Sequence, residues 1–105
     1  MLILNTFDVP GKEIEAISLV KGNIVYSKNV IKDIGAGLKN IVGGELRSYT
    51  AMLSEAREIA TKRMTEEAIK LNADAILNVS YSTCSITEGA IEIIAYGTAV
   101  RFIEN

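Results

Sequence analysis

Residues 45–71 read ELRSYTAMLSEAREIATKRMTEEAIKL, and this stretch decides the fold. Its apolar side chains recur at intervals of three and four residues, which is the spacing of a helix that buries one face. We therefore predict a helix from about Glu45 to Leu71, ended by Asn72 in the left-handed conformation. The predicted apolar stripe consists of Leu46, Tyr49, Leu53, Ala56, Ala60, Met64, Ala68 and Leu71.

Two strands are predicted after this helix, Ala75–Ile86 and Ala90–Ile103, joined by a turn at residues 87–89. The last strand is apolar on both faces, whereas a strand buried on one side alternates with polar residues. One face would carry Ile91, Ile93, Ala95 and Ala99, and the other Ile94, Tyr96, Val100 and Phe102. One long helix covers only one face of a sheet. We therefore expect another subunit to cover the second face, with Ile91, Ile93 and Tyr96 in the interface.

The chain before the helix is predicted to begin with a short strand at residues 2–4. Two further strands, Ile14–Val20 and Ile24–Ser27, would flank a turn at Gly22 and Asn23, and one long bent strand is the alternative. A short helix is expected within Asn29–Asn40. The order of elements indicates a two-layer domain of the α/β (α+β) class.

Composition limits what this domain can do. Its 105 residues fit a single domain, 1–105, and 49% of them are hydrophobic, which favours burial against a partner. The net charge is −2 and no basic block exceeds the pair Lys62-Arg63, so nucleic acid is not an expected partner. The sequence contains no run of ~20 apolar residues, so no membrane span is predicted. The single cysteine and a start unlike a signal peptide favour a cytoplasmic location.

The sequence contains no histidine. Without histidine, the chain cannot form the serine and cysteine catalytic sets that depend on an imidazole, nor the common zinc motifs that contain histidine. An enzyme would have to rely on carboxylates, Tyr49 or Cys84. We therefore expect a protein that is not an enzyme and has no catalytic residues.

Cys84 and a pair on the long helix are the candidate ligand-binding residues. The Cys84 thiolate could bind a soft metal or metalloid ion, and a ring of subunits could bring several thiolates together or pair each with a carboxylate. The alternative is a cysteine that is simply packed. Glu45 and Tyr49 are four residues apart and could both face the corner at Gly43-Gly44, where a small molecule could bind. The alternative is structural, with Glu45 as a residue of the first helical turn and Tyr49 as part of the apolar stripe.

Several segments together resemble a known family. They are Asp33–Glu45, Tyr49, Ala56–Ala60, Asn72–Val79 and Gly97–Val100. The chain is identified on these segments as a member of the YbjQ-type family of small prokaryotic proteins, a family often described as heavy-metal-binding. The resemblance implies a dodecin-like subunit, in which one helix packs on a curved antiparallel sheet. It also implies a ring-shaped homopentamer in which the sheets join.

These observations lead to a functional hypothesis with two rivals. The first is a homo-oligomeric binding module that holds a soft heavy metal, a metalloid or another small ligand where subunits meet. The second is a structural or scaffolding ring that binds a protein partner and no ligand. The third is an enzyme, which the missing histidine disfavours.

Overall fold

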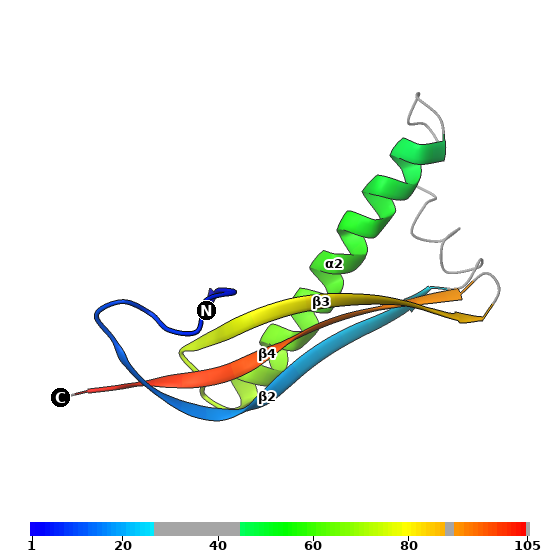
Figure 1. The fold of residues 1–105 in the computed structure, drawn as a ribbon. Coiled ribbons are helices and arrows are strands. Elements are labelled where there is room, and N and C mark those ends of the chain that lie inside the picture. The colour runs from blue at the N-terminus through cyan, green and yellow to red at the C-terminus, as the bar shows by residue number, and fades with distance from the viewer. Residues whose placement is uncertain (27–44, 88–89, 105) are drawn as a thin grey trace.

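The computed structural model describes residues 1–26, 45–87 and 90–104. Its elements are β1 (Leu2–Ile3), β2 (Glu13–Tyr26), α2 (Glu45–Lys70), β3 (Ala75–Thr87) and β4 (Ala90–Ile103). The strands form one sheet in the order β1-β3-β4-β2, and α2 lies against one face of it (Figure 1). This arrangement confirms the predicted two-layer α+β class and the long helix. The helix predicted within 29–40 lies outside the described residues.

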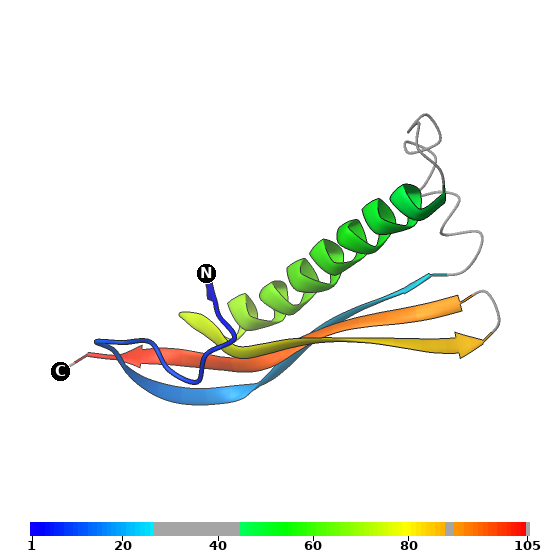
Figure 2. The ribbon, with the colours of Figure 1, turned by 45° about the horizontal axis from the view of Figure 1, so that its top comes forward.

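The three long strands pair antiparallel, as predicted, and the sheet bends along its length (Figure 2). Strand β1 adds a feature that the sequence did not suggest, because it pairs with β3 in parallel. The chain continues along β3 after β1. The Leu4 amide donates to the Ile76 carbonyl at 2.9 Å, and the Val79 amide donates to the Leu4 carbonyl at 3.0 Å. The sheet is therefore mixed and open.

The predicted turn at Gly22 and Asn23 is wrong, and the alternative of one long strand is confirmed. Strand β2 continues through these residues and pairs with β4 from Glu13 to Tyr26, with one bulge between Ala16 and Ser18. A Cβ on Gly22 would overlap the Ala60 carbonyl oxygen and the Met64 backbone nitrogen. Glycine inside a strand often marks such a close approach of another backbone. Gly22 therefore lets α2 lie directly on β2 and does not turn the chain.

Helix α2 is held to the sheet by a stripe of small residues and methionines. Ala56, Ala60, Met64 and Ala68 are completely buried, and they pack with residues of β3 and β4 that include Ile76 and Ile93. Leu71, predicted in the same stripe, is exposed because the helix ends at Lys70. In the part of the chain that the structure describes, no helix has the length and apolarity needed to cross a membrane.

The end of α2 confirms the predicted role of Asn72, whose φ is 58°. The Ala73 amide donates to the Ala68 carbonyl at 3.1 Å, and the Asn72 amide donates to the Ile69 carbonyl at 3.0 Å. These two bonds define a Schellman motif, which satisfies carbonyl groups that the helix leaves unpaired. The Arg101 guanidinium adds a bond to the Leu71 carbonyl at 3.2 Å. The helix end is thus fixed to β4.

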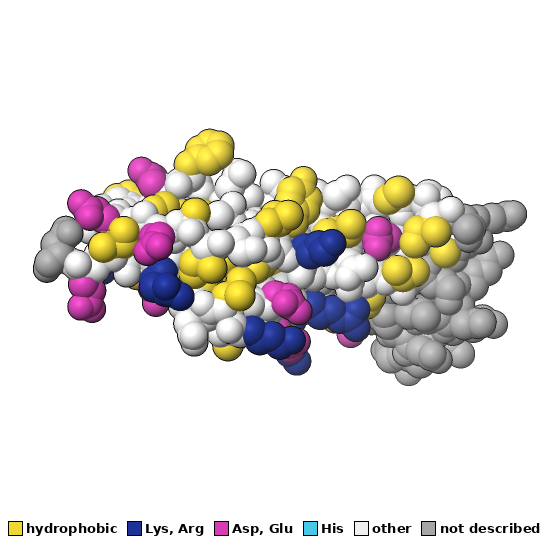
Figure 3. All heavy atoms as spheres, turned by 90° about the horizontal axis from the view of Figure 1, so that it is seen from below, with side chains coloured by type: hydrophobic (Ala, Val, Ile, Leu, Met, Phe, Trp, Pro, Cys, Tyr) yellow, Lys and Arg dark blue, Asp and Glu magenta, His cyan; other side chains and the backbone are white. Residues whose placement is uncertain are grey.

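The face of the sheet opposite α2, which we call the outer face, is partly covered by the chain itself. Buried residues Ala75, Leu77 and Val100 pack there against Leu4 and Val9 of the N-terminal segment. Farther along the same face, Leu19 is 67% exposed and Tyr96 is 40% exposed. Figure 3 shows the molecule from below, with apolar side chains along its length. The N-terminal segment therefore covers part of the outer face and leaves other apolar side chains of this face exposed.

Candidate functional site

Cys84 lies on the outer face, next to a carboxylate from the central strand. Side chains alternate along a strand, and Gly22 and Ile24 of β2 are buried beneath α2, so Val25 faces away from the helix. The pairing register sets Val25 opposite Glu92 on one side of β4, and Cys84 opposite Glu92 on the other. Directly opposed residues share a face, with Cβ atoms about 5 Å apart. The Cys84 thiol and the Glu92 carboxylate are therefore neighbours.

Both groups are accessible and one of them is held in place. Cys84 is exposed, and its Sγ lies 3.6 Å from the Ser85 carbonyl oxygen. Glu92 is half-buried, and its Oε2 accepts a hydrogen bond from Asn23 Nδ2 at 3.0 Å. A carboxylate has two oxygens with several lone pairs, so this one bond leaves capacity for a ligand. Asn23 of β2 thus orients the side chain of Glu92 on β4. Cys84 lies on β3, on the other side of β4.

This pair combines a soft sulfur donor with a carboxylate oxygen. Thiolates select soft ions, and carboxylates complete the coordination of many metals that bind sulfur. Within residues 1–26, 45–87 and 90–104, no group of three or more cysteine, aspartate or glutamate side chains is placed to hold a metal ion. The described part of one chain therefore offers two donors here, and a three- or four-coordinate ion would need further donors.

The other predicted site residues are not brought to this place. Glu45 and Tyr49 belong to the first turns of α2, and their side chains lie outside the described part of the structure. Ile93 is completely buried beneath α2 and Ile91 is half-buried against the same core. Tyr96 lies on the outer face, beside Lys21 and Ser80 in the register. Of the three predicted interface residues, Tyr96 presents the largest accessible surface to a neighbouring molecule.

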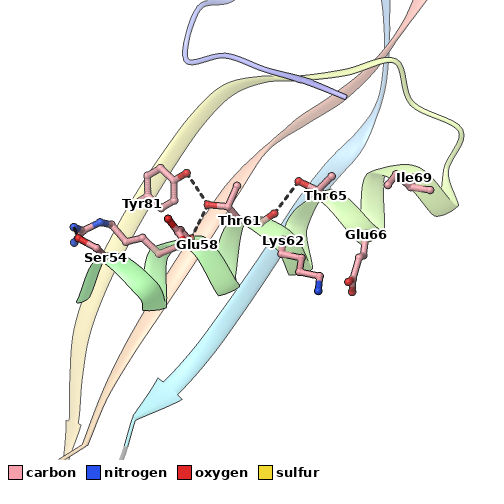
Figure 4. Close-up of a pocket in the computed structure, with 9 residues that line it drawn as sticks. Ser54, Glu58, Thr61, Lys62, Thr65, Glu66, Ile69 and Tyr81 are labelled. Atoms are coloured by element: carbon pink, nitrogen blue, oxygen red, sulfur yellow. Dashed lines mark hydrogen bonds between the residues drawn. The ribbon is translucent and has the colours of Figure 1, made fainter. Parts of the chain in front are cut away.

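A second feature, which the sequence analysis missed, is a groove of about 760 Å³ between α2 and β3 (Figure 4). Its walls come from one flank of α2 and from Tyr81 of β3. The Thr61 hydroxyl donates to the Arg57 carbonyl at 2.6 Å and also contacts the Tyr81 hydroxyl at 2.8 Å, so Tyr81 must donate in the second bond. The lining residues are Ser54, Arg57, Glu58, Thr61, Lys62, Thr65, Glu66, Ile69 and Tyr81.

The fold places the chain in the class of small α+β proteins in which one long helix covers one face of an open sheet, and in this chain Cys84 is exposed on the opposite face. The chain belongs to the YbjQ-type family, whose model matches residues 1–103 and is described as "Putative heavy-metal-binding".

Curated relatives agree with this assignment, and a solved structure has a similar fold. A UPF0145 protein of Clostridium novyi is 57% identical over 103 residues, which is 98% of this chain and all of the relative. A UPF0145 protein of Vibrio parahaemolyticus is 50% identical over 105 residues, covering 99% of this chain and all of the relative. A crystal structure of a Pediococcus pentosaceus protein of unknown function, from the DUF74 family, is similar in fold, with a TM-score of 0.60 and 16% identity over 98% of both chains.

Two segments that carry the family resemblance have structural roles in this chain. Asn72 ends the helix, and the Asp74 carboxylate accepts a hydrogen bond from the Phe102 amide at 2.7 Å. A Cβ on Gly97 would lie 2.8 Å from Ile76 Cγ2 and 2.9 Å from the Leu77 carbonyl oxygen. Glycine at position 97 therefore lets β3 and β4 approach each other at the bulge near Leu77. These roles concern the backbone and not a ligand.

Proposed function

We propose that the protein is a homo-oligomeric binding module that holds a soft metal or metalloid ion through Cys84 and Glu92 where subunits meet. The observation that carries this proposal is the register of β3 and β4, which sets the two side chains directly opposite each other on an accessible face. The description of the family model as heavy-metal-binding supports the same class of ligand.

The number of donors supports an assembly. A thiolate and a carboxylate from one chain leave a tetrahedral soft ion two ligands short. A second copy that placed its own pair nearby would complete the coordination with groups of the same kind. By its resemblance to the family, the proposed assembly is a pentameric ring.

The exposed apolar residues on the outer face also favour association. Val25 lies opposite Glu92 of the proposed site, and Leu19 and Tyr96 lie farther along the same face. Apolar side chains exposed on one face can contribute to a contact between copies. Burying these side chains between copies would place Cys84 at or near the contact.

Native mass spectrometry combined with Cd²⁺ titration tests the proposal. The chain itself contains no histidine, so a histidine tag would add the only imidazoles that could bind the ion. The protein should therefore be purified without such a tag. We expect an oligomer that takes up Cd²⁺ in fixed proportion to subunits, with the ultraviolet absorbance of a cadmium thiolate. Cys84→Ser should abolish both signals, and Thr83→Ala, on the opposite face of the same strand, should change neither.

Two outcomes would overturn parts of the proposal. Equal Cd²⁺ uptake by the Cys84→Ser variant would remove Cys84 from the site. An intact oligomer that binds no Cd²⁺ would favour the scaffolding alternative, in which the assembly serves a protein partner.

A further inference from the structure

We propose that Arg63, on the helix side of the sheet, is a positioning residue for ion binding at the outer face, and that it acts through Asn23. The inference rests on the proposed function, because it concerns how Glu92 is held when Cys84 and Glu92 bind an ion. It starts from two hydrogen bonds that meet at Asn23 and join α2 to the candidate site.

Asn23 uses its main chain for one of these bonds and its side chain for the other. Its carbonyl oxygen accepts a hydrogen bond from Arg63 Nη1 at 2.6 Å. Its side-chain Nδ2 donates to Glu92 Oε2 at 3.0 Å. The first bond is charge-assisted because the donor is a guanidinium, and such bonds are shorter and stronger than those between neutral groups. One residue of β2 therefore links the helix to the carboxylate of the candidate site.

The packing of α2 on β2 explains why Arg63 reaches this strand. A Cβ on Gly22 would lie 2.8 Å from the main-chain carbonyl carbon of Arg63, so the two backbones touch at the residue that precedes Asn23. The Arg63 side chain thus starts beside β2 and has to extend only to the next residue of the strand. Glu67, one turn farther along the helix, pairs with Lys70 at 3.7 Å. The contact at Gly22 therefore sets the position from which Arg63 binds Asn23.

The place of β2 in the sheet gives this bond its effect. Among the described residues, β2 is the last strand of the sheet and pairs with β4 on one side only. A side chain on such a strand is only as well placed as the backbone that carries it. Arg63 supports the Asn23 backbone from the helix, so the Asn23 amide keeps its direction toward Glu92. Partners that orient a metal ligand strengthen ion binding, and the loss of Arg63 should loosen Asn23 first and Glu92 through it.

The sign of the effect separates positioning from simple electrostatics. Arg63 carries a positive charge, and a positive charge repels a metal cation. If charge alone mattered, Arg63→Met should strengthen the binding of Cd²⁺. If Arg63 positions Asn23, the same change should weaken it. Arg63→Lys keeps the charge and one donor that can reach the carbonyl, so it is the conservative replacement.

Isothermal titration with Cd²⁺ measures this effect. Arg63→Met should weaken binding about threefold, which is less than the about tenfold loss expected when the orienting partner Asn23 itself is removed. Arg63→Lys should restore the affinity of the parent. Lys62→Met is the matched control, because it removes one positive charge from the neighbouring position of α2, on the side that lines the groove. This control should bind Cd²⁺ at least as tightly as the parent.

Two further readouts distinguish positioning from a general loss of stability. Arg63→Met combined with Asn23→Ala should bind Cd²⁺ as Asn23→Ala does alone, because Arg63 acts through the amide that is already lost. The cadmium NMR signal of the bound ion should move in the same direction in Arg63→Met as in Asn23→Ala, since both changes release Glu92. A change that only lowers stability would leave the coordination of the ion, and hence this signal, as in the parent.

Separate outcomes identify which idea fails. If the parent takes up no Cd²⁺, the proposed function is wrong and Arg63 has no ion to position. If the parent binds Cd²⁺ and Glu92→Gln does not, but Arg63→Met binds as tightly as the parent or more tightly, the proposed function stands and the role of Arg63 is wrong. If the losses in Arg63→Met and Asn23→Ala add in the double variant, Arg63 does not act through Asn23.

Discussion

The backbone nitrogen of Met64 lies where a Cβ on Gly22 would have to stand. The helix and β2 are therefore in contact through their backbones, and both residues are buried at this point. The obstacle to a larger residue at position 22 is main chain on both sides, which cannot move aside as a flexible side chain could.

Gly22→Ala should lower the free energy of unfolding by about 2 kcal/mol or more, as for other overpacked positions. Urea unfolding at a fixed protomer concentration measures this change. Lys21→Ala, at the neighbouring exposed position, is the matched control and should lie within about 0.5 kcal/mol of the parent. Equal stability of the two variants would mean that α2 does not rest on β2 at Gly22.

Met64→Ala should cost about 3 kcal/mol, because Met64 is the largest fully buried side chain in the described part of α2 and its removal leaves a cavity. Glu58→Ala, on the solvent side of the same helix, should change stability by less than about 0.5 kcal/mol. Thermal unfolding of both variants at one concentration makes the comparison. A small effect at Met64 would contradict its central place in the core.

Asn72→Gly should keep or slightly raise stability, because glycine adopts the left-handed conformation at φ 58° without a steric penalty. Asn72→Val should lower stability by about 1–2 kcal/mol, since a branched side chain is strained there. Denaturant unfolding distinguishes the two. If valine were tolerated as well as glycine, the Schellman motif would not be what ends α2.

Asn23→Ala should weaken Cd²⁺ binding about tenfold while leaving the thiolate in place, because a partner that orients a metal ligand commonly contributes that much. The reason is the bond from Asn23 Nδ2 to Glu92 Oε2, which is lost in the variant. Glu92→Gln should have a larger effect, since it removes the carboxylate itself. Isothermal titration with Cd²⁺ gives both affinities, and unchanged binding in Glu92→Gln would exclude this carboxylate from the site.

Local signals were enough to predict the main elements of the fold. The spacing of Ala56, Ala60, Met64 and Ala68 predicted α2, and Asn72 was correctly predicted as its end. The Gly22-Asn23 pair was misread because glycine serves both in turns and where two backbones touch. The sequence offered no means of choosing between these uses, since the second depends on a helix some 40 residues away.

Of the two residues in the candidate site, only Cys84 could be predicted from the sequence. Cys84 stood out as the single thiol, but its neighbour depends on the register between β3 and β4, which shifts between Leu77 and Ser80 and again between Ser85 and Thr87. Such irregularities decide which carboxylate stands opposite, and they leave no distinct pattern in the sequence. The groove beside Tyr81 was missed for a similar reason, because it joins residues from two elements.

The backbone roles of Asn72, Asp74 and Gly97 affect how knowledge can be transferred between relatives. A homologue that shares these residues shares the means of ending its helix and closing its sheet, whatever it binds. Identity at these three positions therefore reflects the fold and says nothing about the ligand. A function measured for one member should pass to another only when the positions that correspond to Cys84 and Glu92 also match.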